Sequence, residues 1–215
     1  MLTTTSRQRQ IGAGMFVAFL LLTAFVVAGW TQSVDDAWMS LMEDLEVPWL
    51  LSVAELFHHL GSVPIALTIS LLVAVAFIVA KKWWAFWAWF AIVAGAQVFS
   101  TVTKLLVDRP RPVDALVHES SASYPSGHAM VSGAAIGIGL AVILGIIWPN
   151  RYRLFLGVGI AYAVVMAWSR TYLRVHWLTD VVGGLVFGTA IVCLVAVAVI
   201  QRRGDAQDGI DESGE

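Results

Sequence analysis

Six segments of the sequence are long and mostly apolar, with short polar stretches between them. They cover residues 11–30, 61–80, 83–103, 128–148, 154–172 and 177–200. About 20 mostly apolar residues are needed to cross roughly 30 Å of hydrocarbon, and helices satisfy their own backbone there. The pattern therefore predicts an all-α integral membrane bundle of six transmembrane helices. The first segment is longer than the apolar part of a secretory signal and lacks a convincing cleavage site, so we interpret it as a retained helix.

The composition supports a membrane protein. The chain has 215 residues, of which 59% are hydrophobic and 13% charged, whereas a soluble domain is nearer half apolar and a quarter charged. The net charge of −2 does not suggest nucleic acid as a partner. No repeat or second domain is visible, so residues 1–203 form one predicted domain. The polar, acidic stretch 204–215 lacks an apolar period and is predicted to be a disordered cytoplasmic tail.

Basic residues divide unequally between the two ends of the predicted helices. Eight of the 13 Lys and Arg residues lie on one side: Arg7, Arg9, Lys81, Lys82, Arg151, Arg153, Arg202 and Arg203. The positive-inside rule makes this side cytoplasmic, with both termini inside. The other five lie on the opposite side and require another explanation: Lys104, Arg109, Arg111, Arg170 and Arg174.

The first outer loop, residues 31–60, is acidic and has no Lys or Arg. Large apolar side chains recur in it at roughly helical spacing, which favours an amphipathic helix at the outer interface with its apolar face toward lipid. A connector with ordinary aromatic anchors explains the pattern equally well. His58 and His59 are adjacent and point to different helix faces, so we interpret both as interfacial.

Three segments on the outer side carry an unusual set of polar residues. They are Lys-Leu-Leu-Val-Asp-Arg-Pro-Arg-Pro at 104–112, Pro-Ser-Gly-His at 125–128, and Ser-Arg-Thr-Tyr-Leu-Arg-Val-His-Trp-Leu-Thr-Asp at 169–180. The cations Lys104, Arg111 and Arg170 suit a dianionic phosphate if the helix ends converge. Ser126 and Gly127 precede a predicted helix, whose N-terminus favours anions, and glycine allows close approach of the backbone.

His176 and Asp180 are spaced i, i+4. On a helix they would share a face, and the carboxylate would orient the imidazole and stabilise its cationic form. That arrangement suits a histidine that attacks phosphorus. His128 has no acid at i+4 and fits a general acid that protonates the leaving oxygen.

Each residue alone has a simpler explanation. Lys104 or Arg170 by itself is typical of a cation that reaches from a helix end to the membrane surface. Asp180 is harder to dismiss, because a charge inside an apolar span costs at least about 2.5 kcal/mol unless it is paired. Taken jointly, the three segments favour a functional site.

The three segments resemble the signature of the type 2 phosphatidic acid phosphatase (PAP2) superfamily. That signature reads Lys-x6-Arg-Pro, then Pro-Ser-Gly-His, then Ser-Arg-x5-His-x3-Asp. Every defining position matches: Lys104, Arg111, Pro112, Pro125, Ser126, Gly127, His128, Ser169, Arg170, His176 and Asp180. The motifs cover residues 104–180, and the six-helix layout extends the likeness over most of the chain. Five neighbouring residues lie outside the motifs and receive no catalytic role: Asp108, Arg109, Asp114, His118 and Arg174.

The resemblance implies a reaction in two steps without metal or cofactor. His176 would form a phosphohistidine supported by Asp180, and His128 would protonate the leaving group and then assist water. The phosphoryl oxygens would be held by Lys104, Arg111, Ser126, Gly127 and Arg170. The last three spans would form the catalytic bundle, and the Gly-x3-Gly pairs 133/137 and 184/188 would let these helices pack closely.

The substrate expected from the resemblance is a membrane lipid phosphate or pyrophosphate at the outer face of a bacterial plasma membrane. Undecaprenyl pyrophosphate, phosphatidylglycerol phosphate and phosphatidic acid all fit, with a slight preference for the pyrophosphate because an outward site suits recycling of a lipid carrier. Two alternatives remain: a phosphotransferase that uses the same phosphohistidine, and a non-catalytic lipid-binding or transport protein. Vanadate-dependent haloperoxidases share the signature but are soluble. The pattern does not indicate an oligomeric state.

Overall fold

The structure is a computed structural model that describes residues 2–212, and every regular element within that range is a helix. The predicted all-α class is therefore confirmed for the described residues. In chain order the elements are α1 (Leu2–Val27), α2 (Gln32–Asp44), α3 (Pro48–Leu60), α4 (Val63–Val79), α5 (Trp83–Val107), η1 (His128–Ile138, with π-helical hydrogen bonding), α6 (Gly139–Ile147), the 3-10 turn η2 (Pro149–Arg151), α7 (Tyr152–Tyr172) and α8 (Leu178–Glu212).

Five helical segments in the described residues are long and apolar enough to cross a membrane. They are Ser6–Val27, Trp83–Val107, His128–Ile147, Pro149–Tyr172 and Leu178–Arg203. The predicted second span, 61–80, lies close to the bounds of α4, but α4 forms with α3 a pair bent by 57° at a short break, and the count reaches six only if this pair is one span. Pro64 lies in the first turn of α4, where proline starts a new helix readily.

The predicted division at residue 203 stays a prediction. Helix α8 continues through this position to Glu212, and residues 213–215 lie outside the described part of the chain.

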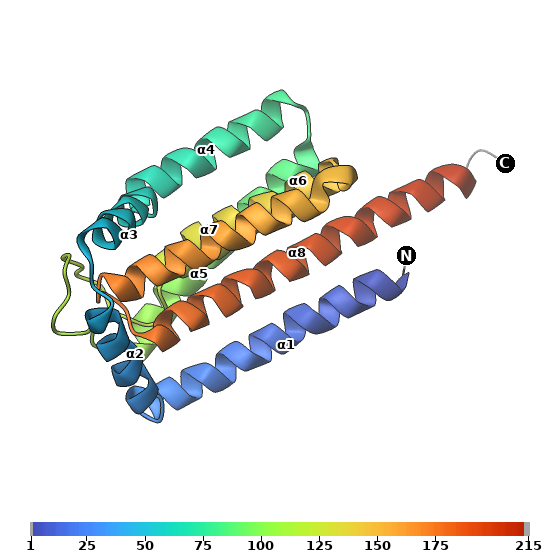
Figure 1. The fold of residues 1–215 in the computed structure, drawn as a ribbon. Helices are drawn as coiled ribbons and strands as arrows, with labels where there is room; N and C mark the ends of the chain where they lie inside the picture. The colour runs from blue at the N-terminus through green and yellow to red at the C-terminus, as the bar shows by residue number, and fades with distance from the viewer. Residues whose placement is uncertain (1, 213–215) are drawn as a thin grey trace.

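Both chain ends lie at the same end of the helical bundle (Figure 1). The most extensive contacts between elements are those of α1 with α8 and those of η1 with α7 and α8. Helices α2 and α3, the long loop 108–127 and the α7–α8 connection gather at the opposite end (Figure 1). All three motif segments are consequently at the end of the bundle away from the termini.

The segment 31–60, predicted from the sequence to be a loop, is folded against the protein. Its two helices, α2 and α3, both contact α7, and Met42 is buried in a cluster with Tyr172 and Leu173 at the end of α7. The expected apolar face of α2 therefore packs partly on the protein instead of only on lipid, while Leu41 and Leu45 stay exposed. Burial of such side chains stabilises the position of α2 beside the motif segments.

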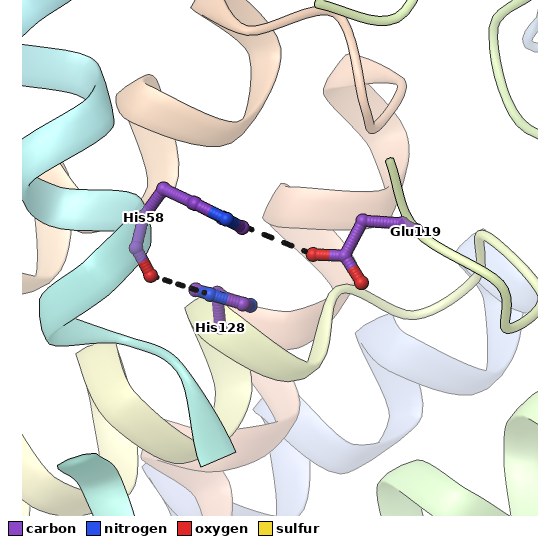
Figure 2. Close-up of side chains that lie close together, drawn as sticks. All are labelled: His58, Glu119 and His128. Carbon is purple, nitrogen blue, oxygen red and sulfur yellow. Dashed lines mark hydrogen bonds and ion pairs between the residues drawn. The ribbon is translucent and has the colours of Figure 1, made fainter. Parts of the chain in front are cut away.

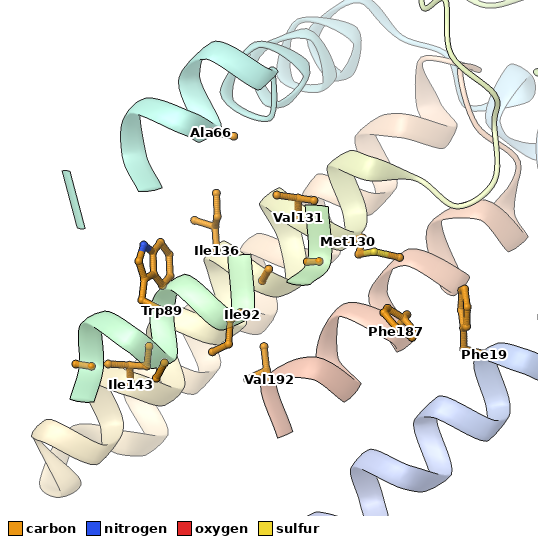
Figure 3. Close-up of a cluster of buried hydrophobic side chains, with 14 of the residues drawn as sticks. Phe19, Ala66, Trp89, Ile92, Met130, Val131, Ile136, Ile143, Phe187 and Val192 are labelled. Atoms are coloured by element: carbon orange, nitrogen blue, oxygen red, sulfur yellow. The ribbon is translucent and has the colours of Figure 1, made fainter. Parts of the chain in front are cut away.

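The main hydrophobic cluster joins α1, α5, η1, α6 and α8 (Figure 3). Phe187 of α8 packs against Phe19 of α1 with ring centroids 4.6 Å apart and against Phe99 of α5 at 4.1 Å. Trp89 of α5 is buried and donates its indole N–H to Ser70 O of α4 at 2.9 Å. This packing holds η1 and the start of α8 in fixed positions relative to each other.

Glycines on α8 allow its backbone to approach η1. A Cβ atom added at Gly184 would lie 2.7 Å from Ser126 O, and one at Gly188 would lie 2.6 Å from the Ala134 Cβ and 2.8 Å from Met130 O. Separations under 3.0 Å are not tolerated without movement of one helix. The close packing expected of these glycines is therefore present between η1 and α8.

Gly188→Ala should destabilise the protein by about 1–3 kcal/mol, because an added methyl group in a packed core forces backbone shifts. Thermal melting in detergent measures this. Gly157→Ala on α7 is the matched control, since its Cβ would have nothing within 4 Å, and it should melt at or slightly above the wild-type temperature. Equal melting temperatures for the two variants would contradict the packing argument.

Candidate active site

His176 and Asp180 lie in contact where the α7–α8 connection enters α8. His176 Nδ1 is 3.2 Å from Asp180 Oδ2, and the two side chains are 2% and 0% exposed. Helix α8 begins only at Leu178, so the pair meets across the first turn and not along a continuous helix. The Trp177 backbone N–H also donates to Asp180 Oδ2 at 2.9 Å. A proton on Nδ1 therefore faces the carboxylate, and the Nε2 lone pair is directed away from it.

Arg111 lies on the other side of the imidazole ring. Its NH1 is 3.2 Å from His176 Nε2 and donates to Val175 O at 2.7 Å. Its Nε donates to Ser121 O at 2.7 Å. The guanidinium is thus fixed by backbone carbonyls from two connections, with its NH1 group directed at His176 Nε2.

Lys104 approaches the same loop from the last turn of α5. Its ammonium donates to Ala122 O and lies 3.4 Å from Ser123 O. The positive charges of Lys104, Arg111 and Arg170 all act on His176. Of the three cations, Arg111 contacts His176 directly, whereas Lys104 contacts the backbone at 122–123 and Arg170 contacts other side chains, so their joint binding of a phosphate stays a prediction.

Arg170 is fully buried in the last turn of α7. Its NH1 is 2.7 Å from His58 Nδ1 on α3, and its NH2 donates to Glu119 Oε1 at 2.7 Å. The Nε atom has no hydrogen-bond partner among the described residues. Since a buried unpaired donor is costly, this atom is available to an anion that enters the site.

Ser126 and Gly127 form the turn that leads into η1. The Ser126 backbone N–H donates to Asp180 O at 3.0 Å, which ties this turn to the first turn of α8. Ser126 is fully buried, and its Oγ accepts the Ala129 N–H at 3.4 Å. The two remote motifs are thereby brought together at the N-termini of two helices.

His128, the first residue of η1, faces α3. Its Nε2 is 3.2 Å from His58 O, and its ring stacks on the His58 ring with centroids 5.6 Å apart (Figure 2). No hydrogen bond joins His128 to His176 within the described chain. Ser169 also lies apart from the imidazole pair, because its Oγ donates to Met166 O within α7.

Several polar residues at this site lie outside the three motifs. Ser123 Oγ donates to Asp180 Oδ2 and is 3.4 Å from His176 Nδ1. Glu119 and His58 hold Arg170, so the interpretation of His58 as interfacial does not match its contacts. Arg109, which received no role from the sequence, donates to Asp180 Oδ1 at 2.7 Å. For Ser123 and Glu119, the sequence offered one signal of a role at the site, which is their position between the first and second motifs.

His58, Glu119 and His128 form the group of side chains whose composition would suit a metal ion (Figure 2). One ligand atom from each lies within 4.8 Å of the others, and histidine with carboxylate is a donor set used by zinc. Arg170, however, already donates to both His58 Nδ1 and Glu119 Oε1. Two of the three ligand atoms therefore bind a cation of the protein itself, and the group is better described as the support of Arg170.

The fold and site define a class of protein, a membrane-spanning helical bundle with a buried histidine–carboxylate pair among cations. The family model of the PAP2 superfamily matches residues 84–204, a range that contains all three motifs. The chain therefore belongs to the PAP2 superfamily of phosphatases, and the predicted family and enzyme class are confirmed.

Similar proteins cover most of the chain. Phosphatidylglycerophosphatase B of Bacillus subtilis is 31% identical over 185 residues, which is 84% of this chain and 91% of the relative. Undecaprenyl-diphosphatase of Sulfolobus acidocaldarius is 29% identical over 136 residues, 63% of this chain and 55% of the relative.

Solved structures agree with the family. The crystal structure of a transmembrane PAP2-type phosphatidylglycerolphosphate phosphatase from Bacillus subtilis superposes with a TM-score of 0.78 at 28% identity, covering 95% of this chain and 97% of that one. LpxE of Aquifex aeolicus shares the fold with a TM-score of 0.58 at 18% identity, covering 76% and 92%.

The surroundings of His176 make its charge state testable. Burial is the largest cause that holds the pKa of His176 well below its usual range, and the neighbouring cations add to this effect, Arg111 first. Arg111→Gln should therefore raise the His176 pKa, whereas Arg111→Lys, which keeps the positive charge, should leave it low. Histidine NMR titration in detergent measures both. A wild-type His176 that gains its proton at or above about pH 6.5, the value of a free histidine, would contradict the prediction.

Proposed function

We propose that this protein hydrolyses a lipid phosphate through a phosphohistidine on His176, without a metal ion. The observation that carries the proposal is the setting of His176, with Nδ1 on Asp180 and Nε2 toward Arg111 at 3.2 Å. A neutral imidazole held in one orientation is a nucleophile, and a cation beside its free nitrogen draws a phosphoryl group to that atom.

The first step forms a bond from His176 Nε2 to phosphorus and breaks the bond from phosphorus to the leaving oxygen. The leaving oxygen takes a proton from His128, which acts as general acid. Asp180 accepts the hydrogen bond from Nδ1 and stabilises the positive charge that develops on the ring. In the second step His128 takes a proton from water, the water oxygen forms a bond to phosphorus, and the bond from phosphorus to His176 Nε2 breaks, which releases inorganic phosphate and the neutral imidazole.

The phosphoryl oxygens would be bound by Lys104, Arg111 and Arg170 together with the Ser126–Gly127 turn. Arg170 Nε, which lacks a partner among the described residues, is a donor ready for one of these oxygens. Developing charge in such a buried, cation-lined site is stabilised strongly because little water screens it. These cations supply the charge neutralisation that a divalent metal supplies in other phosphatases.

The site would face the outside of a bacterial plasma membrane, with both termini in the cytoplasm. The chain ends lie at one end of the bundle and the site at the other (Figure 1). The basic loops at Lys81–Lys82 and Arg151–Arg153 lie at the same end as the termini in the helix order, which favours that end as cytoplasmic.

The substrate we favour is a glycerolipid phosphomonoester such as phosphatidylglycerol phosphate. The relative that covers most of this chain carries the name phosphatidylglycerophosphatase, and so does the solved structure that superposes over 95% of it. Undecaprenyl pyrophosphate is the second candidate, because other relatives are named undecaprenyl-diphosphatase. This order reverses the slight preference that orientation alone suggested.

His176→Ala should abolish phosphate release from every lipid substrate, a loss of about 10⁴-fold or more, because no covalent step remains. Brief incubation with ³²P-labelled lipid should label the wild-type protein with a bond that is stable to alkali and lost in acid, and should not label the variant. His118→Ala, at an exposed histidine of the 108–127 loop, is the matched control and should keep both turnover and labelling. Retained turnover in a folded, membrane-inserted His176→Ala protein would overturn the mechanism.

Phosphate release from a panel of lipid mono- and diphosphates in detergent with EDTA should be undiminished by the chelator. Phosphatidylglycerol phosphate should give the highest kcat/KM, followed by undecaprenyl pyrophosphate. Activity that is lost with EDTA and restored by a divalent ion would contradict a metal-independent reaction. Transfer of the label to an added sugar or lipid hydroxyl instead of water would identify a phosphotransferase, and binding without turnover would identify a lipid-binding protein.

A further inference from the structure

We propose that Asp35 and Arg109 are positioning residues that hold Asp180, and through it His176, in the orientation for attack. This inference rests on the proposed function of His176. Asp35 lies in α2, far from the motifs in sequence. Arg109 is one of the six unspecified residues between the lysine and the arginine of the first motif.

Arg109 joins two carboxylates in the interior. Its NH1 is 2.7 Å from Asp180 Oδ1, and its NH2 is 2.7 Å from Asp35 Oδ2. The exposed fractions are 8% for Arg109 and 0% for both acids. Buried charges are retained only when they are paired and hydrogen-bonded throughout, since removal of one partner leaves an uncompensated charge. The fork of the guanidinium, with donors on two separate nitrogens, matches this bridging task.

Asp35 also clamps the first turn of α8. Its Oδ1 accepts the Thr179 backbone N–H at 2.9 Å, and its Oδ2 accepts the Thr179 hydroxyl at 2.8 Å. A carboxylate at this place satisfies a free N–H of the helix start and interacts favourably with the helix dipole. Thr179 directly precedes Asp180, so α2 fixes the turn from which the Asp180 side chain extends.

The contacts of Asp180 divide between its two oxygens. Oδ1 accepts from Arg109, whereas Oδ2 faces His176 Nδ1 and accepts from Ser123 and the Trp177 backbone. With Oδ1 held by a fixed guanidinium, the carboxylate cannot turn, and Oδ2 stays directed at the imidazole. The geometry of His176 is therefore set by a chain of contacts that begins on α2.

The charges of Asp35, Arg109 and Asp180 affect the stability of the phosphohistidine intermediate. One guanidinium between two carboxylates leaves a single negative charge in excess, next to a neutral His176. The ring becomes cationic when it is phosphorylated, and this excess charge then balances it. Without the Asp35 charge, the remaining Arg109–Asp180 pair would be neutral and would offset less of the positive charge that the ring gains, in a site that little water screens.

Asp35→Asn should lower kcat about tenfold to hundredfold, the order of loss that a small misplacement of reacting groups causes, while KM changes less than about twofold. The steady-state amount of ³²P-phosphoenzyme should fall with it. Asp36→Asn is the matched control, because Asp36 is the exposed neighbour on the same helix, and it should keep wild-type kcat. Melting in detergent for each variant separates folding from catalysis.

A double-mutant cycle tests whether Asp35 acts through Arg109. Arg109→Lys keeps one charge but its single ammonium cannot bridge both carboxylates, so it should lower kcat by itself, and Asp35→Asn should add little further loss in that background. If Asp35→Asn does not fold, Arg109→Lys alone makes the test, and wild-type kcat in that variant overturns the proposal.

Fully multiplicative losses in the double variant, a change in KM alone, or unchanged kcat in Asp35→Asn would each overturn the positioning role. These outcomes are distinct from failure of the proposed function, which would be turnover in His176→Ala. An inactive His176→Ala with a fully active Asp35→Asn would overturn only the inference about Asp35 and Arg109.

Discussion

The buried carboxylate of Asp180 is the group on which the site depends. An ionised carboxylate within an apolar bundle is stable only when every oxygen is hydrogen-bonded or paired. Asp180 meets this requirement with partners from two regions: Arg109 and Ser123 from the loop 108–127, and His176 and the Trp177 backbone from the α7–α8 connection. Its backbone carbonyl accepts the Ser126 N–H as well. The need to satisfy one charge therefore draws together the start of η1, the start of α8 and the loop that carries the cations.

The same requirement explains the five basic residues at the end of the bundle away from the termini. Lys104, Arg111 and Arg170 surround His176 and supply the positive field of the candidate phosphate site. The other two are paired with acidic residues of α2 and of the turn that follows it: Arg109 with Asp35, and Arg174 with Glu43 and with Glu46 just after the helix. The acidity of α2 is thus a complement to cations at the bundle end, in addition to any contact with solvent. Surface pairs such as those of Arg174 are worth little individually, whereas the buried Arg109 is paired with both Asp35 and Asp180, and loss of one partner would leave a buried charge uncompensated.

The motif residues could be predicted because each motif is a short stretch of sequence with fixed spacings between its residues. His176 and Asp180 are four positions apart, so their side chains meet whether the residues lie within one helix or at its start. Residues such as Asp35, Glu119 and His58 could not be found in this way, because their roles depend on where α2, α3 and the loop 108–127 fold against the bundle. The predicted second span, 61–80, starts at the break before α4, but the sequence did not show that the residues before it form a helix bent against α4, since hydropathy reports only length and apolarity. Gly61 at the end of α3 and Pro64 at the start of α4 were local signals of that break.

The bend between α3 and α4 has a structural reason at the site. A Cβ atom at Gly61, in the break, would lie 2.3 Å from His128 Cδ2 and 2.9 Å from the Met166 sulfur, so the backbone there lies directly against the histidine ring. Gly61 O accepts from Ser132 at 3.2 Å, one turn further along η1. A straight second span would carry α3 away from this contact, and with it the His58 carbonyl on His128 and the His58 ring on Arg170. The interruption of the span thus places a third histidine, absent from the motifs, between the candidate general acid and a candidate phosphate ligand.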